Sequence, residues 1–224
     1  MNNIKTFENF NNQDIFTYIR NNDIESVKKY IDSGYGLNIQ NNDGNTPLIL
    51  TTYNYNSEIV KLLLNAGADV DKQDNDGYTA LILAAYYNRI EIVKLLLNAG
   101  ADLNKQNNNG DTSLIWAAIN NNIKIVKLLL NAGAYIDKQN NSGNNALIWA
   151  ASNNNREILE LLLDYGADEF ILNYEDKSFY DYLNTKNQQY FTQNYPTSVY
   201  NAISHNYKKS FTEFVKDYNI KKNN

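Results

Sequence analysis

The sequence contains no cysteine, two prolines, one methionine and one histidine among its 224 residues. The lack of cysteine excludes disulfide bridges and thiolate chemistry, and it fits a reducing compartment, so we expect a cytoplasmic protein. With a single histidine, His205, the usual zinc sites and His/Cys catalysis are excluded. No glycine-rich nucleotide-binding motif occurs either. We therefore expect no cofactor, no metal site and no enzymatic activity.

Long apolar runs are also missing. No stretch is long enough to span a bilayer, and the first residues lack the apolar core of a secretory signal. The net charge of −5 and the isoelectric point of about 4.9 argue against nucleic acid or a membrane surface as a partner. Hydrophobic residues still make up 43% of the chain, which is enough to build a folded core.

What the sequence does contain is an internal repeat. The phrase KLLLNAGA occurs at 61–68, 94–101 and 127–134, and each copy starts 33 residues after the previous one. Other positions keep the same step, among them Gly44, Gly77, Gly110 and Gly143, then Gly67, Gly100, Gly133 and Gly166, then Leu48, Leu81, Leu114 and Leu147. Parallel ladders of this kind are typical of stacked structural repeats.

One step of the repeat can be interpreted physically. Gly77 permits a tight turn at a hairpin-like tip, and Thr79 is placed to cap a first helix over 80–87. A second helix is predicted over 90–98, with Gly100 supplying its left-handed C-terminal cap. The apolar face of this second helix is wide, so it needs burial on more than one side. Stacking of neighbouring copies provides that burial.

The stretch DGNTPLILTTYNYNSEIVKLLLNAGADVD resembles the ankyrin repeat. The resemblance implies an all-α ankyrin-repeat solenoid of helix–turn–helix repeats, with hairpin-like fingers and a concave groove lined by the first helices. Four full repeats are predicted at 41–73, 74–106, 107–139 and 140–172. Residues 1–40 are predicted to form a degenerate N-terminal capping repeat. Residues 173–224 are predicted to form a C-terminal partial repeat and an amphipathic helix.

The chain departs from the family pattern in two ways. Where the family has His after Thr-Pro-Leu, this chain has isoleucine, which predicts altered packing within the same fold, at Ile49, Ile82, Ile115 and Ile148. The family's glycine between the two helices is replaced by asparagine, the non-glycine residue best suited to positive φ, at Asn88, Asn121 and Asn154. Tyr55 occupies this place in the first full repeat, so local strain or a shifted turn is predicted there.

The C-terminal partial repeat, which is the sixth when the N-terminal capping repeat is counted, is expected to remain incomplete. Asp176 stands at the finger-glycine position, and Pro196 stands where the full repeats have a mid-helix leucine. Apolar residues from Val199 to Tyr218 then keep helical spacing. We expect this helix to cover the end of the last repeat of a monomeric chain. Self-association through 197–218 is the alternative.

Functional residues are expected where the repeats differ, because the identical positions are explained by stacking. The variable positions fall at the finger tips and at the ends of the first helices, which line the groove in the family that the chain resembles. The predicted partner-binding residues are Asp43, Asn45, Tyr53, Asp76, Tyr78, Tyr86, Tyr87, Asn109, Asp111, Trp116, Ile119, Asn120, Trp149, Ser152 and Asn153. The two tryptophans have a second interpretation, as side chains that fill the space between repeats.

The resemblance therefore implies a protein–protein interaction module that binds a partner protein through its concave groove and finger loops. Aromatic side chains on that surface favour this interpretation, because they supply large contact area at low entropy cost. A regulatory or inhibitory protein that masks an enzyme or toxin would use the same groove and is the first alternative. An enzyme built on a carboxylate pair is the less favoured one.

Overall fold

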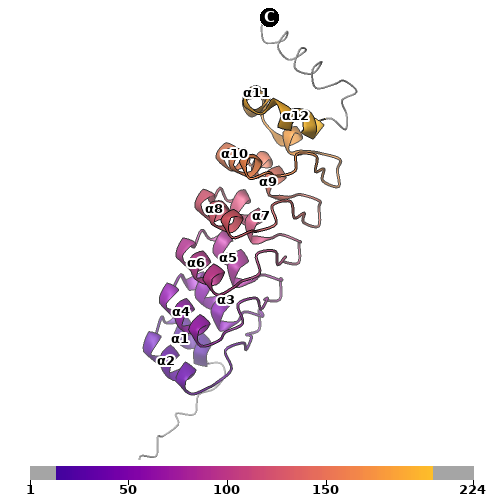
Figure 1. The fold of residues 1–224 in the computed structure, drawn as a ribbon. Helices are drawn as coiled ribbons and strands as arrows, with labels where there is room; N and C mark the ends of the chain where they lie inside the picture. Colours follow the sequence, from indigo (N-terminus) through magenta and orange to yellow (C-terminus); the bar gives the residue numbers. More distant parts are fainter. Residues whose placement is uncertain (1–13, 204–224) are drawn as a thin grey trace, which may run out of the picture. The chain divides into compact units, whose positions relative to one another are not determined.

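The computed structural model describes residues 14–203, with side chains up to residue 199, and every regular element in this range is helical. The chain divides into two compact units, residues 1–108 and 109–224. In the described part of the first unit, helices stack in pairs, and the loops that precede the first helices project to one side (Figure 1). These helices are α1 (Asp14–Arg20), α2 (Ile24–Asp32), α3 (Pro47–Asn54), α4 (Ser57–Asn65), α5 (Ala80–Tyr86) and α6 (Ile90–Asn98).

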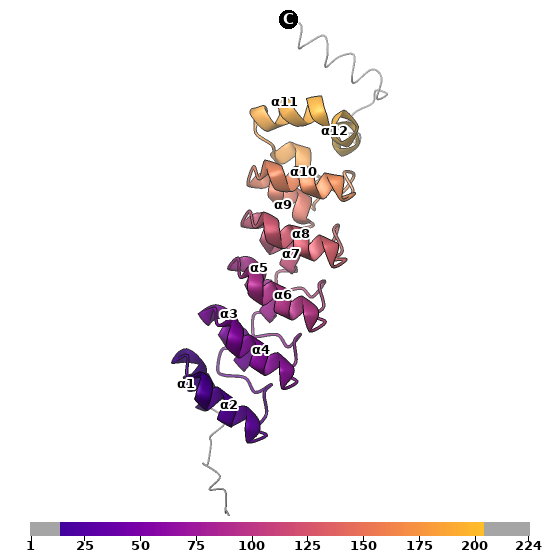
Figure 2. The same ribbon diagram turned by 60° about the vertical axis from the view of Figure 1, so that its left-hand side comes forward.

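The second unit repeats the same arrangement (Figure 2). First helix packs against first helix, α7 against α9, and second helix against second helix, α8 against α10. Its elements are α7 (Ser113–Ile119), α8 (Ile123–Asn131), α9 (Ala146–Ser152), α10 (Arg156–Asp164), the 3-10 helix η1 (Phe179–Tyr182), α11 (Thr185–Asn194) and α12 (Pro196–Ile203).

The first helices α3, α5, α7 and α9 each begin at a side-chain cap. The Thr46 hydroxyl accepts a hydrogen bond from the Ile49 N–H at 3.1 Å, and Pro47 follows as the first helical residue. The same position caps α5, α7 and α9, where the capping residues are Thr79, Thr112 and Asn145. The predicted start of the first helices is therefore confirmed. The isoleucines that replace the family's histidine are all buried, at Ile49, Ile82, Ile115 and Ile148.

The turn between the two helices of a pair requires a left-handed residue. The predicted positive φ is confirmed at Asn88, Asn121 and Asn154, where φ is 57°, 56° and 55°. The prediction of a shifted turn at Tyr55 is wrong, because Tyr55 has φ 56° and ψ 39° and forms the same turn. An aromatic residue in this conformation costs about 1–2 kcal/mol relative to a right-handed one. Strain is thus present at Tyr55 without a change of path.

The core consists of apolar residues from successive pairs. Leu48 and Leu81 are each 1% exposed on the first helices of the first unit, and Ile59, Val60 and Leu63 are fully buried on α4. The apolar face of α6 is narrower than predicted, since Leu95 and Leu97 are only half-buried. Burying one such side chain stabilises the fold by roughly 1.5–3 kcal/mol. Each pair therefore depends on its neighbours for stability.

The loops that project from the helix pairs are tight turns, which we call fingers; they include residues 41–45, 74–78, 140–144 and 173–177, and the corresponding place in the repeat falls at 107–111. In the finger 74–78, Asp74 Oδ1 accepts hydrogen bonds from the N–H groups of Asp76 at 3.0 Å and Tyr78 at 2.8 Å. Three other fingers use an asparagine for the same two bonds, at Asn41, Asn140 and Asn173. Side chains of this type stabilise turns by closing them onto the backbone.

Neighbouring fingers are joined to one another. The Asn75 N–H donates to the Asp43 carbonyl at 3.2 Å, and the Asn108 N–H donates to the Asp76 carbonyl at 2.9 Å. In the second unit the Tyr174 N–H donates to the Ser142 carbonyl at 3.1 Å. We call these backbone bonds the finger ladder. Because one finger supplies the acceptor for the next, the ladder fixes the spacing of the finger tips.

A glutamine clamps each finger to the next at its base. Gln73 Nε2 donates to the Gly77 carbonyl at 2.5 Å and to the Gln106 carbonyl, 33 residues further on, at 2.8 Å. Gln40 and Gln139 form the equivalent pairs of bonds. Much of the abundant amide content of the chain thus holds the backbone rather than facing a partner.

The segment after the last full repeat contains a turn and new helices. Asp176 takes the finger-glycine conformation with φ 57°, and Pro196 opens the new helix α12. Val199 of α12 is fully buried, and α12 packs against α11 and η1. The rest of the predicted amphipathic helix, residues 204–218, lies outside the described residues.

The glycines provide a test of the finger ladder. Gly44 and Gly67 both have positive φ, but a Cβ on Gly44 would lie 2.5 Å from the Asn75 backbone nitrogen, whereas a Cβ on Gly67 would meet nothing within 4 Å. We expect Gly67→Ala to lower the free energy of unfolding by about 1–2 kcal/mol from backbone strain alone. Gly44→Ala should lose about 2 kcal/mol more, because the next finger must move. Urea denaturation followed by circular dichroism measures both, and equal losses would contradict the ladder.

Candidate functional site

Aromatic side chains gather at the ends of the first helices in the first unit. The ring of Tyr87 lies edge-on to Tyr86, with centroids 4.6 Å apart, and edge-on to Tyr53, with centroids 5.6 Å apart. We call Tyr53, Tyr86 and Tyr87 the tyrosine cluster. Tyr86 is 37% and Tyr87 39% exposed, while Tyr53 is half-buried. Tyr87 therefore contacts two other residues of the predicted binding set.

An arginine that the sequence analysis did not single out holds one side of this cluster. The Arg89 guanidinium lies over the ring of Tyr55 at 4.5 Å from its centroid, and 5.8 Å from the centroid of Tyr87. Tyr55 is 52% exposed at the left-handed turn after α3. A cation over a tyrosine face at an exposed site contributes roughly 0.5–1 kcal/mol. The only signal in the sequence was an arginine beginning the second helix beside a run of tyrosines.

The tyrosine cluster lies in negative potential on its finger side. Burial, together with the charges of Asp74 and Asp76 and the neighbouring tyrosines, raises the pKa of Tyr53 to about 12. Burial also raises the pKa of Asp74. The hydrogen bonds that its carboxylate accepts from the backbone N–H groups of Tyr78 and Asp76 lower this pKa and partly offset the effect of burial. The Tyr53 hydroxyl thus stays protonated at physiological pH and can donate a hydrogen bond.

The finger residues of the predicted set are not equivalent. Asp43 and Asp76 are exposed, and their carboxylates form no hydrogen bond or ion pair with the described residues. Asn45 and Tyr78 are half-buried. Asp111 is a correction to the predicted set, since it is 5% exposed and its Oδ1 accepts a 2.7 Å hydrogen bond from Asn140. Its carboxylate supports the fold rather than facing a partner.

The second unit carries a different surface at the ends of its first helices. Trp116 on α7 and Trp149 on α9 are both half-buried, so they combine packing with partial exposure. Ile119 is half-buried beside them in sequence, and its carbonyl accepts a 3.4 Å hydrogen bond from Asn153 Nδ2. The remaining predicted residues of this unit are exposed, at Asn109, Asn120, Ser152 and Asn153.

The exposed aromatics of the second unit that the sequence analysis missed are Tyr135, Tyr165, Phe170 and Tyr174, and the last two lie at or before a finger. Tyr174 is 76% exposed on the finger at 173–177, and Phe170 is 57% exposed before it. Tyr174 stands 33 residues after Asn141, so its place in the repeat could have identified it as a finger-tip residue. Phe170 carries no comparable signal.

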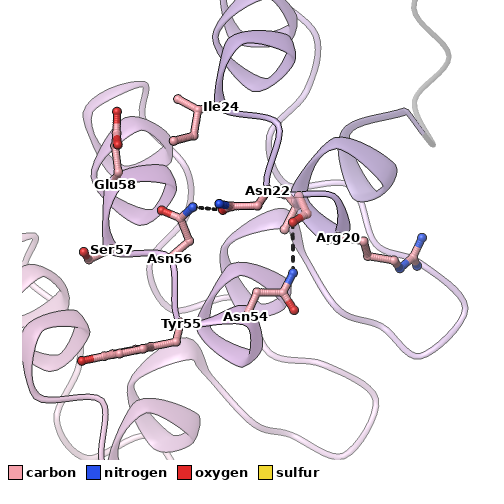
Figure 3. A pocket seen from close by; sticks show the side chains of 9 residues that line it. Arg20, Asn22, Ile24, Asn54, Tyr55, Asn56, Ser57 and Glu58 are labelled. Carbon is pink, nitrogen blue, oxygen red and sulfur yellow. Dashed lines mark hydrogen bonds between the residues drawn. The ribbon is translucent and has the colours of Figure 1, made fainter.

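An open polar cleft lies at the helix turns of the first unit, with a volume of about 640 Å³ (Figure 3). Asn22 and Asn56 point toward one another across it and are hydrogen-bonded, and Asn54 Nδ2 donates to the Ile19 carbonyl at 3.0 Å. Arg20 and Glu58 point away from one another. A similar cleft of about 770 Å³ lies beside α10 and α11 of the second unit. The charged groups of the first cleft do not converge as catalytic groups would.

Comparison with known proteins identifies the family. The family model for ankyrin repeats, in three copies, matches residues 15–107 and 99–173. The crystal structure of EF0377, an ankyrin repeat protein, matches with a TM-score of 0.76 and 32% sequence identity over 82% of this chain and 96% of that chain. None of the curated proteins matches the chain.

The chain belongs to the ankyrin-repeat family, and its fold is the all-α ankyrin solenoid that the sequence predicts. This fold is typically a non-enzymatic binding scaffold, and ankyrin repeats are generally protein–protein interaction modules. Across residues 14–203, the helices are too short or too polar for any of them to cross a membrane.

The raised pKa of Tyr53 predicts how stability depends on pH. Its pKa of about 12 lies above the value in an unfolded chain, so its contribution to stability is complete below pH 10 and is lost as the pH rises toward 12. Asp74→Asn should lower the pKa of Tyr53, while the turn survives because asparagine closes the other fingers. The Tyr53 ring resonance, assigned with Tyr53→Phe, can be followed by NMR as the pH is raised. A wild-type midpoint near pH 10, the ordinary tyrosine value, would refute the burial argument.

Proposed function

We propose that the chain is a binding module that recognises another protein through the tyrosine cluster and the finger tips of its first unit. The single observation that supports this most is the pair Tyr86 and Tyr87, which present partly exposed rings held edge-to-face. Partly exposed aromatic rings on a protein surface lose little entropy on binding and are enriched among the residues that dominate interface energies.

The surface is already ordered before a partner arrives. The finger ladder sets the spacing of the tips, and Arg89 holds the rings of Tyr55 and Tyr87 from one side. A preorganised surface loses less conformational freedom on association, and more of the contact energy then appears as affinity. This favours binding without large rearrangement.

The half-exposed tryptophans of the second unit, with Asn109, Asn120, Ser152 and Asn153, belong to the proposal as further contact surface. Catalysis is not part of the proposal, because Arg20 and Glu58 point apart in the open cleft at the helix turns of the first unit. A regulatory or inhibitory protein that masks an enzyme or toxin would use the same surface. The identity of the bound protein separates that role from a scaffold.

Selection from a library of short random peptides tests the proposal. We expect peptides that bind the wild type to bind Tyr86→Ala/Tyr87→Ala about tenfold or more weakly, because truncating a hot-spot aromatic costs at least about 1 kcal/mol each. The matched control is Tyr135→Ala/Tyr174→Ala, which removes two tyrosines of 58% and 76% exposure from the second unit.

Affinities are measured by fluorescence anisotropy, and unchanged far-ultraviolet circular dichroism confirms that both variants remain folded. Selected peptides that bind the two double variants equally well would show that the tyrosine cluster is not the binding surface.

A further inference from the structure

The tyrosine cluster lies beside an uneven distribution of charge. The segments that surround it are the fingers 41–45 and 74–78 and the helices α3 and α5. Together they contain three carboxylates, Asp43, Asp74 and Asp76, and no lysine or arginine. The helices themselves carry no charged residue at all. Within these four segments all the formal charge is therefore negative and lies in the fingers, while the cation beside the cluster, Arg89, comes from the helix turn.

Two of the three carboxylates are available to a ligand. Asp74 is occupied, because its Oδ1 accepts the two backbone N–H groups that close its own finger. Asp43 and Asp76 are exposed, and their side chains form no hydrogen bond or ion pair with the described residues. They occupy the same position in successive fingers, which the bond from the Asn75 N–H to the Asp43 carbonyl joins directly. The two carboxylates are thus presented side by side at a fixed spacing.

The aromatic rings of the same unit suit a cation as well. Tyrosine faces carry negative potential, and they attract ammonium and guanidinium groups. Arg89 already shows such a contact beside the cluster, at 4.5 Å from the centroid of Tyr55. It contacts Tyr55 and Tyr87 from the side of the helix turns, and the charges that act on the Tyr53 hydroxyl are those of Asp74 and Asp76. The finger side of the cluster is therefore negative.

The second unit provides an internal comparison. Its corresponding segments 109–111, 140–144, α7 and α9 contain one carboxylate, that of Asp111, which is buried and bonded to Asn140. The finger positions equivalent to Asp43 and Asp76 are Asn109, Ser142 and Glu175, and the Glu175 carboxylate is paired with Lys177 at 2.7 Å. Carboxylates at this finger position without an ion pair to the described residues, in a unit with exposed tyrosines at the ends of its first helices, thus distinguish the first unit, and the shared repeat architecture does not require them.

From this juxtaposition we infer that the occupant of the first unit's surface is a basic peptide segment of a partner protein, rich in lysine or arginine. Its cations contact Asp43 and Asp76, and the aliphatic stems of the same side chains pack on the rings of Tyr86 and Tyr87. Long basic side chains combine an apolar stem with a charged head, and so match a surface of rings bordered by carboxylates. This inference rests on the proposed function and specifies the chemistry of its partner.

The test uses three synthetic peptides of equal length: one alternates arginine with serine and glycine, and in the other two glutamine or glutamate replaces arginine. The full chain is compared with Asp43→Asn/Asp76→Asn, which folds as before because Asn109 stands at the same finger position. The matched control is Glu25→Gln/Glu91→Gln, which removes the same charge from the exposed surfaces of α2 and α6. Fluorescence anisotropy measures each affinity at low and at high ionic strength.

We expect the arginine peptide alone to bind the wild type, and its affinity to fall at high salt. The Asp43/Asp76 variant should weaken it about fivefold or more, and the Glu25/Glu91 control less than about twofold. Equal weakening by the two variants would overturn the inference, because attraction would then follow net charge alone. Equal binding of the glutamine peptide would overturn it too.

Failure of this inference can be told apart from failure of the proposed function. Peptides selected from the random library are bound to the tyrosine variant and to the Asp43/Asp76 variant in parallel. Peptides that depend on Tyr86 and Tyr87 but not on the carboxylates would leave the tyrosine surface standing and refute a basic occupant. Peptides that bind both variants as tightly as the wild type would refute both proposals.

Discussion

The structure depends on the bond that each finger makes to the next. A single backbone hydrogen bond of about 3 Å, such as that from the Asn108 N–H to the Asp76 carbonyl, adds only about 1 kcal/mol by itself. Its importance lies in repetition, since an inner finger such as 74–78 donates to one neighbour and accepts from the other. The close approach it requires explains why glycine stands at the finger tips, where a Cβ would collide with the following backbone. Helix stacking alone would leave the exposed loops without a fixed register.

This constraint connects the fold to its surface. Once the fingers are held, the ends of α3 and α5 and the finger tips become one continuous platform within the first unit. The variable residues on it are free to differ because the invariant ones carry the stability. Here they differ by gathering tyrosines at the helix ends and leaving two carboxylates uncommitted at the tips. Arg89 fixes the remaining edge, so that the platform has an aromatic centre, a cationic border at the helix turns and an acidic border at the fingers.

Much of this architecture was predictable from sequence because it follows from local rules. A Thr that precedes an apolar run caps a helix, and Asn88, Asn121 and Asn154 were expected in the left-handed region for steric reasons. At Tyr55 the sequence predicts local strain or a shifted turn, and the structure has the strain without the shift, because packing with Arg89 and the shared geometry of the helix pair hold Tyr55 in the left-handed turn.

The site was less predictable than the fold, since it depends on which side chains meet across repeats. Variation between repeats singled out Tyr53, Tyr86 and Tyr87, whose rings the structure brings together, but variation cannot reveal burial. Asp111 was therefore predicted to face a partner, although it is buried and accepts a hydrogen bond from Asn140. Arg89 was missed because its role exists only through two rings contributed by different turns. The many asparagines were uninterpretable in sequence, and the structure shows that several of them bond the backbone of a neighbouring finger.

The most direct test of the central claim, that the fingers are held in register by their mutual backbone bonds, is amide hydrogen exchange measured by NMR. The Asn75 and Asn108 amides lie on exposed finger tips yet donate to the Asp43 and Asp76 carbonyls. The account predicts protection corresponding to an opening free energy of about 2 kcal/mol or more for both amides. The neighbouring Asn42 amide, which donates to none of the described residues, should exchange freely. Exchange of Asn75 and Asn108 at the rate of Asn42 would contradict the account, because the fingers would then be independent loops without a common register.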